Sequence, residues 1–249
     1  MNPNAAHEPI IKIENLYKKY GDNVVLDGFN LNLYQGENLV IMGKSGSGKS
    51  VMIKCLIGLE IPDSGTIEIM SQKLEHLSLK ALDEIRADIG FLFQGSALYD
   101  SMTVRENLEF PLRRHISKFG NVKDTLPLVE EALQNVGLKN VIDLMPNELF
   151  GGMKRRVALA RTLILKPKII IYDEPTTGLD PITSKEIILL MKSVQEKYKT
   201  SSIIITHDVD CARVIANRMI LLIDGKNYAE GTFAELSTSQ DPKVKAFFK

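Results

Sequence analysis

The chain has 249 residues, of which 44% are hydrophobic. This length allows one large domain or two small ones, each with a buried core, and the composition argues against disorder. Lysine and arginine together number 31, as do aspartate and glutamate, so the formal net charge is zero. Because no net charge attracts the chain to polyanions, we expect no nucleic-acid partner and no general attraction to an anionic membrane.

The amino terminus and the cysteines indicate the cellular compartment. Residues 1–9 lack the basic and apolar segments of a secretory signal, and no apolar run is long enough to span a bilayer. Cys55 and Cys211 lie within apolar patterns and not in metal-ligand pairs such as Cys-x-x-Cys. We therefore expect a cytoplasmic protein with two reduced cysteines in its core.

Short strands and tight turns dominate the first 70 residues or so. Turn signals rich in glycine, proline, aspartate and asparagine occur at residues 20–23 and 62–65. The apolar residues around them predict strands at residues 10–13, 29–33, 38–42 and 66–69. Between residues 96 and 165 the sequence becomes charged, with helical spacing at residues 126–133, which predicts a helical insert.

Two nearly continuous apolar runs follow this insert. They occupy residues 169–172 and 202–206 and are typical of strands buried on both faces of a parallel sheet. Helical segments at residues 184–198 and 209–217 complete an alternation of strands and helices. Residues 241–248 predict a short capped amphipathic helix, after which we expect no further regulatory domain.

A glycine-rich loop occupies residues 43–50, between the strand that ends at Met42 and a helix that begins near Lys49. Its glycines let the backbone curl so that N–H groups point at phosphate oxygens, and the helix N-terminus adds positive potential. In such a loop Lys49 contacts the β- and γ-phosphates and the Ser50 hydroxyl is a ligand of Mg²⁺. The alternative is a glycine-rich turn without a ligand. We predict that a nucleoside triphosphate contacts Gly43, Lys44, Ser45, Gly46, Ser47, Gly48, Lys49, Ser50 and Val51.

Two carboxylates follow the buried strand at residues 169–172. Asp173 can hold the Mg²⁺ shell through water, and Glu174 is placed to polarise the attacking water. Both would lie at the carboxyl edge of the sheet, beside the glycine-rich loop, where open α/β sheets bind their ligands. Without that loop, the same pattern could be only a strand end that meets solvent.

Several shorter motifs follow one another in a specific order. They are Tyr20 before Gly21, Gln94 after Phe-Leu-Phe, the segment Leu-Phe-Gly-Gly-Met at residues 149–153, Gly-Leu-Asp at residues 178–180, and His207 at the end of a strand. In this order they resemble the motifs of the nucleotide-binding subunits of ABC transporters, over nearly the whole chain. We call residues 149–153 the signature segment, after the corresponding motif of that family.

The resemblance implies a fold, an activity and two cofactors. The implied fold is α/β, a P-loop NTPase core of mainly parallel sheet with an N-terminal antiparallel β subdomain and a helical insert subdomain. We expect one ABC ATPase domain at residues 8–249, with a RecA-like core at 8–95 and 166–236, a helical subdomain at 96–165 and a short C-terminal helix at 240–249. The implied activity is ATP hydrolysis coupled to transport, with ATP and Mg²⁺ bound.

The resemblance also assigns roles to single residues of the nucleotide site. Tyr20 resembles the aromatic residue that stacks on adenine, although a tyrosine before a turn is otherwise unremarkable. Gln94 resembles the glutamine that reaches Mg²⁺ and the attacking water and senses the membrane partner. His207 resembles the histidine that contacts the γ-phosphate, although on pattern alone a histidine at a strand end is more often hydrogen-bonded structure.

A second copy of the chain is the expected first partner. In the family, two subunits close head to tail, so that each ATP lies between the loop of one subunit and the signature segment of the other, here Gly151, Gly152 and Met153. Asp180 resembles the residue that couples the two sites across this dimer. Its alternative role is to cap a helix that begins at Pro181.

One residue departs from the family pattern. The family sequence is Leu-Ser-Gly-Gly-Gln, whose serine donates a hydrogen bond to the γ-phosphate, and Phe150 occupies that position here. Because Gly151 and Gly152 still allow backbone N–H groups to face the phosphate, our hypothesis is weakened closure and slowed hydrolysis, with ATP binding retained.

Three details resemble the ATPases of Mla-type lipid transport systems. They are Val51 after Lys49-Ser50, the run at residues 91–104, and residues 151–156. Such systems move phospholipids between bacterial envelope membranes and pair the ATPase with a permease and an Mce-domain lipid-binding protein. The resemblance therefore implies an ABC permease and an Mce-domain protein as partners and a peripheral location on the cytoplasmic face of the inner membrane.

The permease would dock on a groove formed in part by the apolar residues Leu98, Tyr99 and Met102. The alternative is that these residues are buried within the helical insert. Burial and docking are compatible roles. We expect the basic residues Lys154, Arg155 and Arg156 to do no more than solvate a helix face.

Other functions remain to be distinguished. A translation ATPase of the ABC type would carry two cassettes in one chain, and a DNA-repair one a long coiled-coil insert; neither feature is present in the sequence. Because Phe150 replaces the serine of the family pattern, the chain could also be an ATP-binding module with impaired hydrolysis. The presence of Glu174 and His207 argues against this alternative. The last alternative is the ATPase of an importer for amino acids or another small solute.

Overall fold

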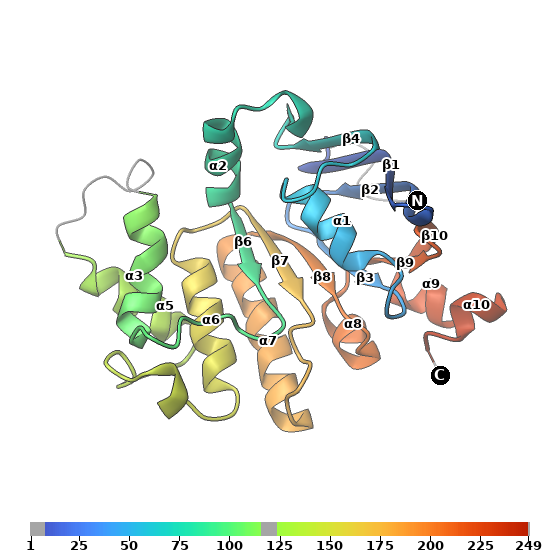
Figure 1. Ribbon diagram of the computed structural model, residues 1–249. Helices are drawn as coiled ribbons and strands as arrows, with labels where there is room; N and C mark the ends of the chain where they lie inside the picture. Colours follow the sequence, from blue (N-terminus) through green and yellow to red (C-terminus); the bar gives the residue numbers. More distant parts are fainter. Residues whose placement is uncertain (1–7, 116–123, 249) are drawn as a thin grey trace.

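The computed structural model describes residues 8–115 and 124–248 and contains two sheets that pack against each other, with helices around them (Figure 1). One sheet has four strands in the order β2-β1-β4-β5, and the other has six in the order β10-β9-β3-β8-β7-β6. The sites predicted above depend on the second sheet, because its strand ends carry the glycine-rich loop and the two carboxylates.

The smaller sheet is antiparallel. Its strands are β1 (Ile11–Tyr20), β2 (Asn23–Leu33), β4 (Ser64–Ile69) and β5 (Gln72–Lys73). β1 and β2 are longer than predicted because they form a hairpin around Gly21, in which Tyr20 pairs with Asn23. One face of this hairpin meets solvent, and its polar residues weaken the apolar pattern by which a strand is recognised.

The larger sheet is parallel except for its last strand, β10. Its strands are β3 (Asn38–Met42), β6 (Ile89–Leu92), β7 (Ile169–Asp173), β8 (Ser201–Ile205), β9 (Arg218–Ile223) and β10 (Lys226–Gly231). The predicted strands at residues 38–42, 169–172 and 202–206 are confirmed, and their residues up to 205 are buried almost throughout. β6, β9 and β10 are absent from the sequence-based prediction.

Helices cover both faces of this sheet. They are α1 (Lys49–Leu56), α2 (Leu79–Ala87), α3 (Val104–Arg114), α5 (Leu126–Asn135), α6 (Met153–Leu163), α7 (Pro181–Tyr198), α8 (Val209–Ile215), α9 (Phe233–Ser237) and α10 (Pro242–Lys245), with single 3₁₀ turns η1 (Leu74–His76) and η2 (Pro146–Glu148). α7 begins three residues before the predicted start because Asp180 caps it, accepting hydrogen bonds from the backbone N–H groups of Ile182 and Thr183. α10 is shorter than the predicted segment 241–248.

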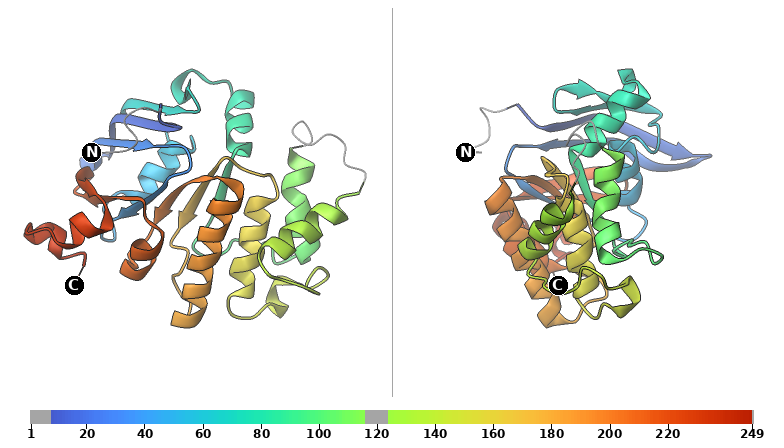
Figure 2. Two further views of the ribbon diagram at one scale, coloured as in Figure 1. Left: turned by 180° about the vertical axis from the view of Figure 1, so that it is seen from behind. Right: turned by 90° about the vertical axis from the view of Figure 1, so that its left-hand side faces the viewer.

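Successive side chains of the central strands pack into two separate cores, because they point to opposite faces of the sheet. Ile169 and Ile171 of β7 belong to the core that includes residues of α1 and the antiparallel sheet, whereas Ile170 and Tyr172 belong to the core that includes residues of α6, α7 and α8. The further views in Figure 2 show these helices on one side of the larger sheet and the antiparallel sheet on the other. This layering leaves the carboxyl ends of β3, β7 and β8 at one edge.

The range 96–165 contains α3, α5 and α6, which pack against one another. α3 begins at a capping box, in which Thr103 and Glu106 each bond the backbone of the other. Residues 116–123 of this range lie outside the described residues, and the division into subdomains stays a prediction. In the described part of the chain no helix is both long and apolar enough to span a membrane.

Both cysteines are free and buried, as predicted. Burial raises the pKa of the Cys55 thiol to about 11 and that of the Cys211 thiol to about 12. Neither thiol therefore ionises appreciably near neutral pH, as expected of residues whose role is packing.

Candidate nucleotide site

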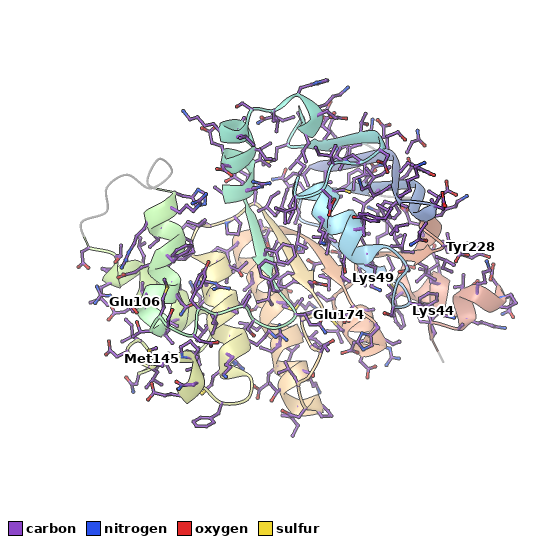
Figure 3. All side chains as sticks on the ribbon, in the orientation of Figure 1. Lys44, Lys49, Glu106, Met145, Glu174 and Tyr228 are labelled. Atoms are coloured by element: carbon purple, nitrogen blue, oxygen red, sulfur yellow. The ribbon has the colours of Figure 1, made fainter. Side chains whose placement is uncertain are left out.

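A cavity of roughly 580 Å³ lies at the carboxyl edge of the larger sheet. Most of the residues predicted to contact the nucleotide and the metal ion line it: Gly43, Lys44, Ser45, Gly46, Gly48, Lys49, Ser50, Val51, Gln94, Asp173, Glu174 and His207, together with Val25. The predicted residues come from the loop before α1, from the first turn of α1, from the end of β7 and from the segments that follow β6, β7 and β8, whereas Val25 belongs to β2. Figure 3 shows Lys49 at the start of α1 and Glu174 in the loop that follows β7. The structure thus brings Gly43 and His207, which are 164 positions apart in the sequence, to one cavity.

The phosphate loop, residues 43–50, needs glycine at two positions. A Cβ at Gly48 would meet the Val25 carbonyl oxygen at 2.7 Å, and φ of Gly48 is +104°, which other residues rarely adopt. A Cβ at Gly43 would meet the Leu222 carbonyl oxygen at 2.8 Å and also the hydroxyl of Ser47. Ser47 does not line this cavity but a neighbouring one, and its buried hydroxyl has no hydrogen-bond partner among the described residues.

Lys49 reaches back over the phosphate loop. Its Nζ donates hydrogen bonds to the carbonyl oxygens of Gly43 at 2.6 Å and Lys44 at 2.9 Å. Burial lowers the pKa of Lys49, although the carboxylates of Glu174 and Asp173 act in the opposite direction. The ammonium group is therefore partly desolvated and lies beside the cavity, where an anionic phosphate would be a stronger acceptor than a carbonyl group.

Asp173 and Glu174 end β7 with different surroundings. Burial raises the pKa of Asp173, the neighbouring Glu174 raises it further, and Lys49 lowers it. Glu174 has φ of +48°, a conformation that costs a non-glycine residue about 1–3 kcal/mol. Its N–H donates to the Ile205 carbonyl oxygen at 2.9 Å, so the strained turn is held against β8.

Two side chains fix the carboxylate of Glu174. The Thr177 hydroxyl donates to its Oε2 at 3.1 Å, and Nδ1 of His207 lies 2.9 Å from the same oxygen. Glu174 itself lines the cavity. Thr177 was not singled out by the sequence, since a threonine three residues after a glutamate is a common pattern with no chemistry of its own.

The oxygen groups in the cavity suit a hard divalent cation. Ser50 offers a hydroxyl, Asp173 a carboxylate and Gln94 an amide oxygen, and Mg²⁺ prefers such ligands while keeping waters and substrate phosphates in its shell. Among residues 8–115 and 124–248, no group of three or more histidine, cysteine, aspartate or glutamate side chains could form an all-protein metal site. The donor set therefore fits a metal ion that arrives with a phosphate ligand.

Tyr20 does not line this cavity. It is 45% exposed at the end of β1, and Nζ of Lys18 lies 5.4 Å from the centre of its ring. Desolvation raises the pKa of its hydroxyl, as does the nearby Glu60. The role in adenine stacking stays a prediction.

The signature segment is also away from the cavity of its own chain. Phe150 is 75% exposed, and Gly151 has φ of +49°. A Cβ at Gly152 would meet Cγ2 of Thr183 at 2.5 Å, so glycine lets the segment lie close against α7. The signature segment therefore does not contribute to the cavity formed within its own chain.

The basic residues that follow the signature segment are not equivalent. Lys154 is exposed and Arg156 is half-buried, where it pairs with Glu186 at 2.8 Å. Arg155 is only 4% exposed, so the prediction that all three solvate a helix face is wrong for this residue. Its position in the first turn of α6, two residues before the buried Val157, gave little signal of burial in an otherwise basic run.

The sequence profile of the family described as ABC transporter matches residues 26–177. The chain belongs to the ABC transporter family. This ABC cassette is 39% identical to the intermembrane phospholipid transport system ATP-binding protein MlaF of Haemophilus influenzae, over 98% of this chain and 91% of that protein. It is 36% identical to the methionine import ATP-binding protein MetN of Campylobacter jejuni, over 96% of this chain and 75% of that protein.

Solved ABC cassettes share the fold. A dimeric ATP-binding cassette in a post-hydrolysis state, bound to ADP and Pi, superposes with a TM-score of 0.80 and 35% identity, over 90% of this chain and 98% of that one. The predicted family and the predicted P-loop NTPase fold with an antiparallel sheet are confirmed. As a member of this family, the ABC cassette binds ATP and hydrolyses it.

Proposed function

We propose that this ABC cassette is the ATPase subunit that energises phospholipid transport between bacterial envelope membranes through a membrane permease. The observation that carries the proposal is the similarity to MlaF over 98% of the chain. Three segments support it because they resemble the corresponding segments of Mla-type ATPases: Val51, residues 91–104 and residues 151–156. The similarity to methionine import proteins favours an amino-acid importer as the second candidate.

The cavity supports a division of roles in ATP hydrolysis. Backbone N–H groups of the phosphate loop and the Lys49 ammonium would bind the β- and γ-phosphates. Ser50, Gln94 and Asp173 would hold Mg²⁺, which offsets the negative charge of the phosphates. Glu174 would accept a proton from the attacking water, and His207, which orients that carboxylate, would contact the γ-phosphate.

A homodimer completes the site in this proposal. The signature segment of one chain would cover the ATP bound to its partner, because it does not line the cavity of its own chain. Asp180 lies on the loop between Glu174 and α7 and would connect the two sites. It also caps α7, so the two roles considered for it are compatible.

Phe150 sets the first test of this arrangement. Replacing it by serine is expected to raise ATP turnover about 10-fold, because a hydroxyl donor to a charged phosphate contributes about 1.5–3 kcal/mol. Phosphate release at saturating MgATP measures the rate. Phe150→Ala is the matched control, since it removes the bulk of the ring without adding a donor. An unchanged rate in Phe150→Ser would mean that the ring turns aside and that hydrolysis is not slowed by it.

The proposed permease surface follows Gln94 in the sequence. Tyr99 is exposed and its ring centre lies 4.9 Å from that of Phe110, while Leu98 packs partly into the core beneath. In this proposal a segment of the permease contacts Leu98, Tyr99 and Met102. These residues would then contribute both to the core and to the docking surface. In this arrangement the cassette is peripheral on the cytoplasmic face of the inner membrane, and an Mce-domain protein is a further component.

Affinity purification of the cassette from its native membranes, in mild detergent and with MgATP, tests the cargo. Mass spectrometry is expected to identify a permease and an Mce-domain protein, and lipid extraction is expected to recover phospholipid in excess over a mock purification. The Glu174→Gln variant is the second bait. It is expected to bind ATP without hydrolysing it and therefore to remain assembled with its partners. A solute-binding protein in place of the Mce-domain protein would contradict the lipid proposal and favour the importer.

A further inference from the structure

Arg155, in the first turn of α6, joins two loops of the nucleotide site. Its Nη1 donates to the carbonyl oxygen of Phe93 at 2.7 Å, and its Nη2 to that of Thr177 at 3.3 Å. Phe93 immediately precedes Gln94, and Thr177 is the residue whose hydroxyl holds Glu174. One guanidinium group therefore spans the loop of Gln94 and the loop between Glu174 and Asp180.

The buried charge of Arg155 is not explained by stability. Among the described residues no carboxylate forms an ion pair with it, and its Nε has no hydrogen-bond partner. Burial accordingly lowers the pKa of its guanidinium. Buried charges without an ionic partner cost folding free energy, and an apolar side chain of similar volume is often at least as stabilising. A residue that costs stability at a functional site is expected to serve the site.

The loop of Gln94 depends on α6 for its conformation. Ser96 and Ala97 have φ of +63° and +48°, which strains two successive non-glycine residues. Arg161, two turns further along α6, donates to both of their carbonyl oxygens, at 3.1 and 2.8 Å. Arg155 binds the other end of the same loop, so α6 holds residues 93–97 at both ends. Because α6 begins at Met153, the last residue of the signature segment, the position of that segment and the position of Gln94 are mechanically linked.

We propose that Arg155 is a positioning residue that sets Gln94 by tying the Phe93 carbonyl group to the first turn of α6 and to the loop after Glu174. The inference rests on the proposed role of Gln94 in hydrolysis. Movement of the signature segment onto a partner's nucleotide is then transmitted to the Gln94 of the moving chain. The contact with the Thr177 carbonyl oxygen anchors the guanidinium group and fixes its position relative to Glu174.

The test compares ATP hydrolysis and thermal stability in the full chain. Arg155→Met is expected to lower kcat by ~10–100-fold, the size of effect that follows a small misplacement of a reacting group, with KM for MgATP changed less than ~3-fold. Its Tm should stay equal or rise, because a buried unpaired charge is removed. Arg155→Lys, which can still donate to one carbonyl group, should recover part of kcat.

Arg156→Met is the matched control on the same helix. Its guanidinium bonds the Val136 carbonyl oxygen and Glu186, away from the cavity. We expect Tm to fall in this variant while kcat stays within ~2-fold, as for a residue far from the reacting groups. A kcat loss in Arg156→Met equal to that in Arg155→Met would show that any loosening of α6 slows hydrolysis, which would overturn the inference.

A double-mutant cycle with Gln94→Ala decides whether Arg155 acts through Gln94. In the Gln94→Ala background, Arg155→Met is expected to lower kcat by less than ~3-fold, because the residue that it positions is already lost. If Arg155→Met lowers kcat by the same factor in both backgrounds, the inference is overturned and the role of Gln94 is unaffected. If Gln94→Ala alone keeps full kcat, the role proposed for Gln94 is wrong, and the inference that depends on it fails for that separate reason.

Discussion

Replacing Glu174 by glutamine is expected to lower ATP turnover by ~10²–10⁴-fold, the usual contribution of a general base, while ATP still binds. Glutamine has nearly the same shape and can still accept the hydrogen bond that the Thr177 hydroxyl donates to Glu174. It cannot accept a proton from the attacking water. The change therefore removes the proton acceptor and leaves most of the geometry in place.

Single-turnover hydrolysis and equilibrium binding of MgATP measure the two expected effects separately. Glu131→Gln, an exposed residue of α5, is the control for the change in charge. A variant that binds ATP and hydrolyses it at a rate close to that of the natural chain would rule out Glu174 as the base. His207→Ala is the companion variant, since His207 lies 2.9 Å from the same carboxylate oxygen.

The backbone at Glu174 adds a reason to expect a large effect. Its φ of +48° is unfavourable for a side chain with a Cβ, and glycine would adopt it more easily. The turn is nevertheless held by the hydrogen bond to Ile205 and by the Thr177 hydroxyl. Strain that is held in place from several sides is typical of residues whose orientation matters for chemistry.

The central strands could be predicted because burial on both faces leaves a continuous apolar run, as in β3, β7 and β8. β6 escaped prediction because it has only four residues and is interrupted by Gly90, which the contact with Thr162 requires. β9 opens on Arg218, a charge that normally marks a surface. Here its guanidinium is buried beside Glu37, at 2.8 Å, a pairing that the sequence separates by 181 positions.

The parts of the site that depend on local sequence were also predictable. The phosphate loop and the two carboxylates at the end of β7 each depend on only a few neighbouring residues, and the parallel sheet brings them to one edge. Arg155 and Thr177 were not predictable, because their importance depends on contacts with Phe93 and Glu174 that no local pattern shows. Tyr20 shows the reverse case, since its motif is local but its ring does not line the cavity.

Lys49→Met is expected to lose about 2–5 kcal/mol of MgATP binding free energy, the range for truncating one partner of a buried charge pair, or roughly 30-fold or more in Kd. In the structure the Lys49 ammonium donates to the Gly43 and Lys44 carbonyl oxygens, and its pKa is lowered by burial. Phosphate oxygens would replace those acceptors and interact with the full charge. Methionine keeps an unbranched side chain that is one atom shorter, and it removes the charge and the donors.

Calorimetric titration with MgATP measures this loss, and thermal unfolding shows whether the fold survives. Because the half-buried ammonium forms no ion pair among the described residues and is partly desolvated, its removal should leave Tm unchanged or higher. Lys54→Met, an exposed lysine of the same helix, is the control and should bind MgATP as the natural chain does. Equal Kd values for the two variants would mean that Lys49 stays on the loop carbonyls when ATP binds, and that the backbone N–H groups and the helix N-terminus hold the phosphates without it.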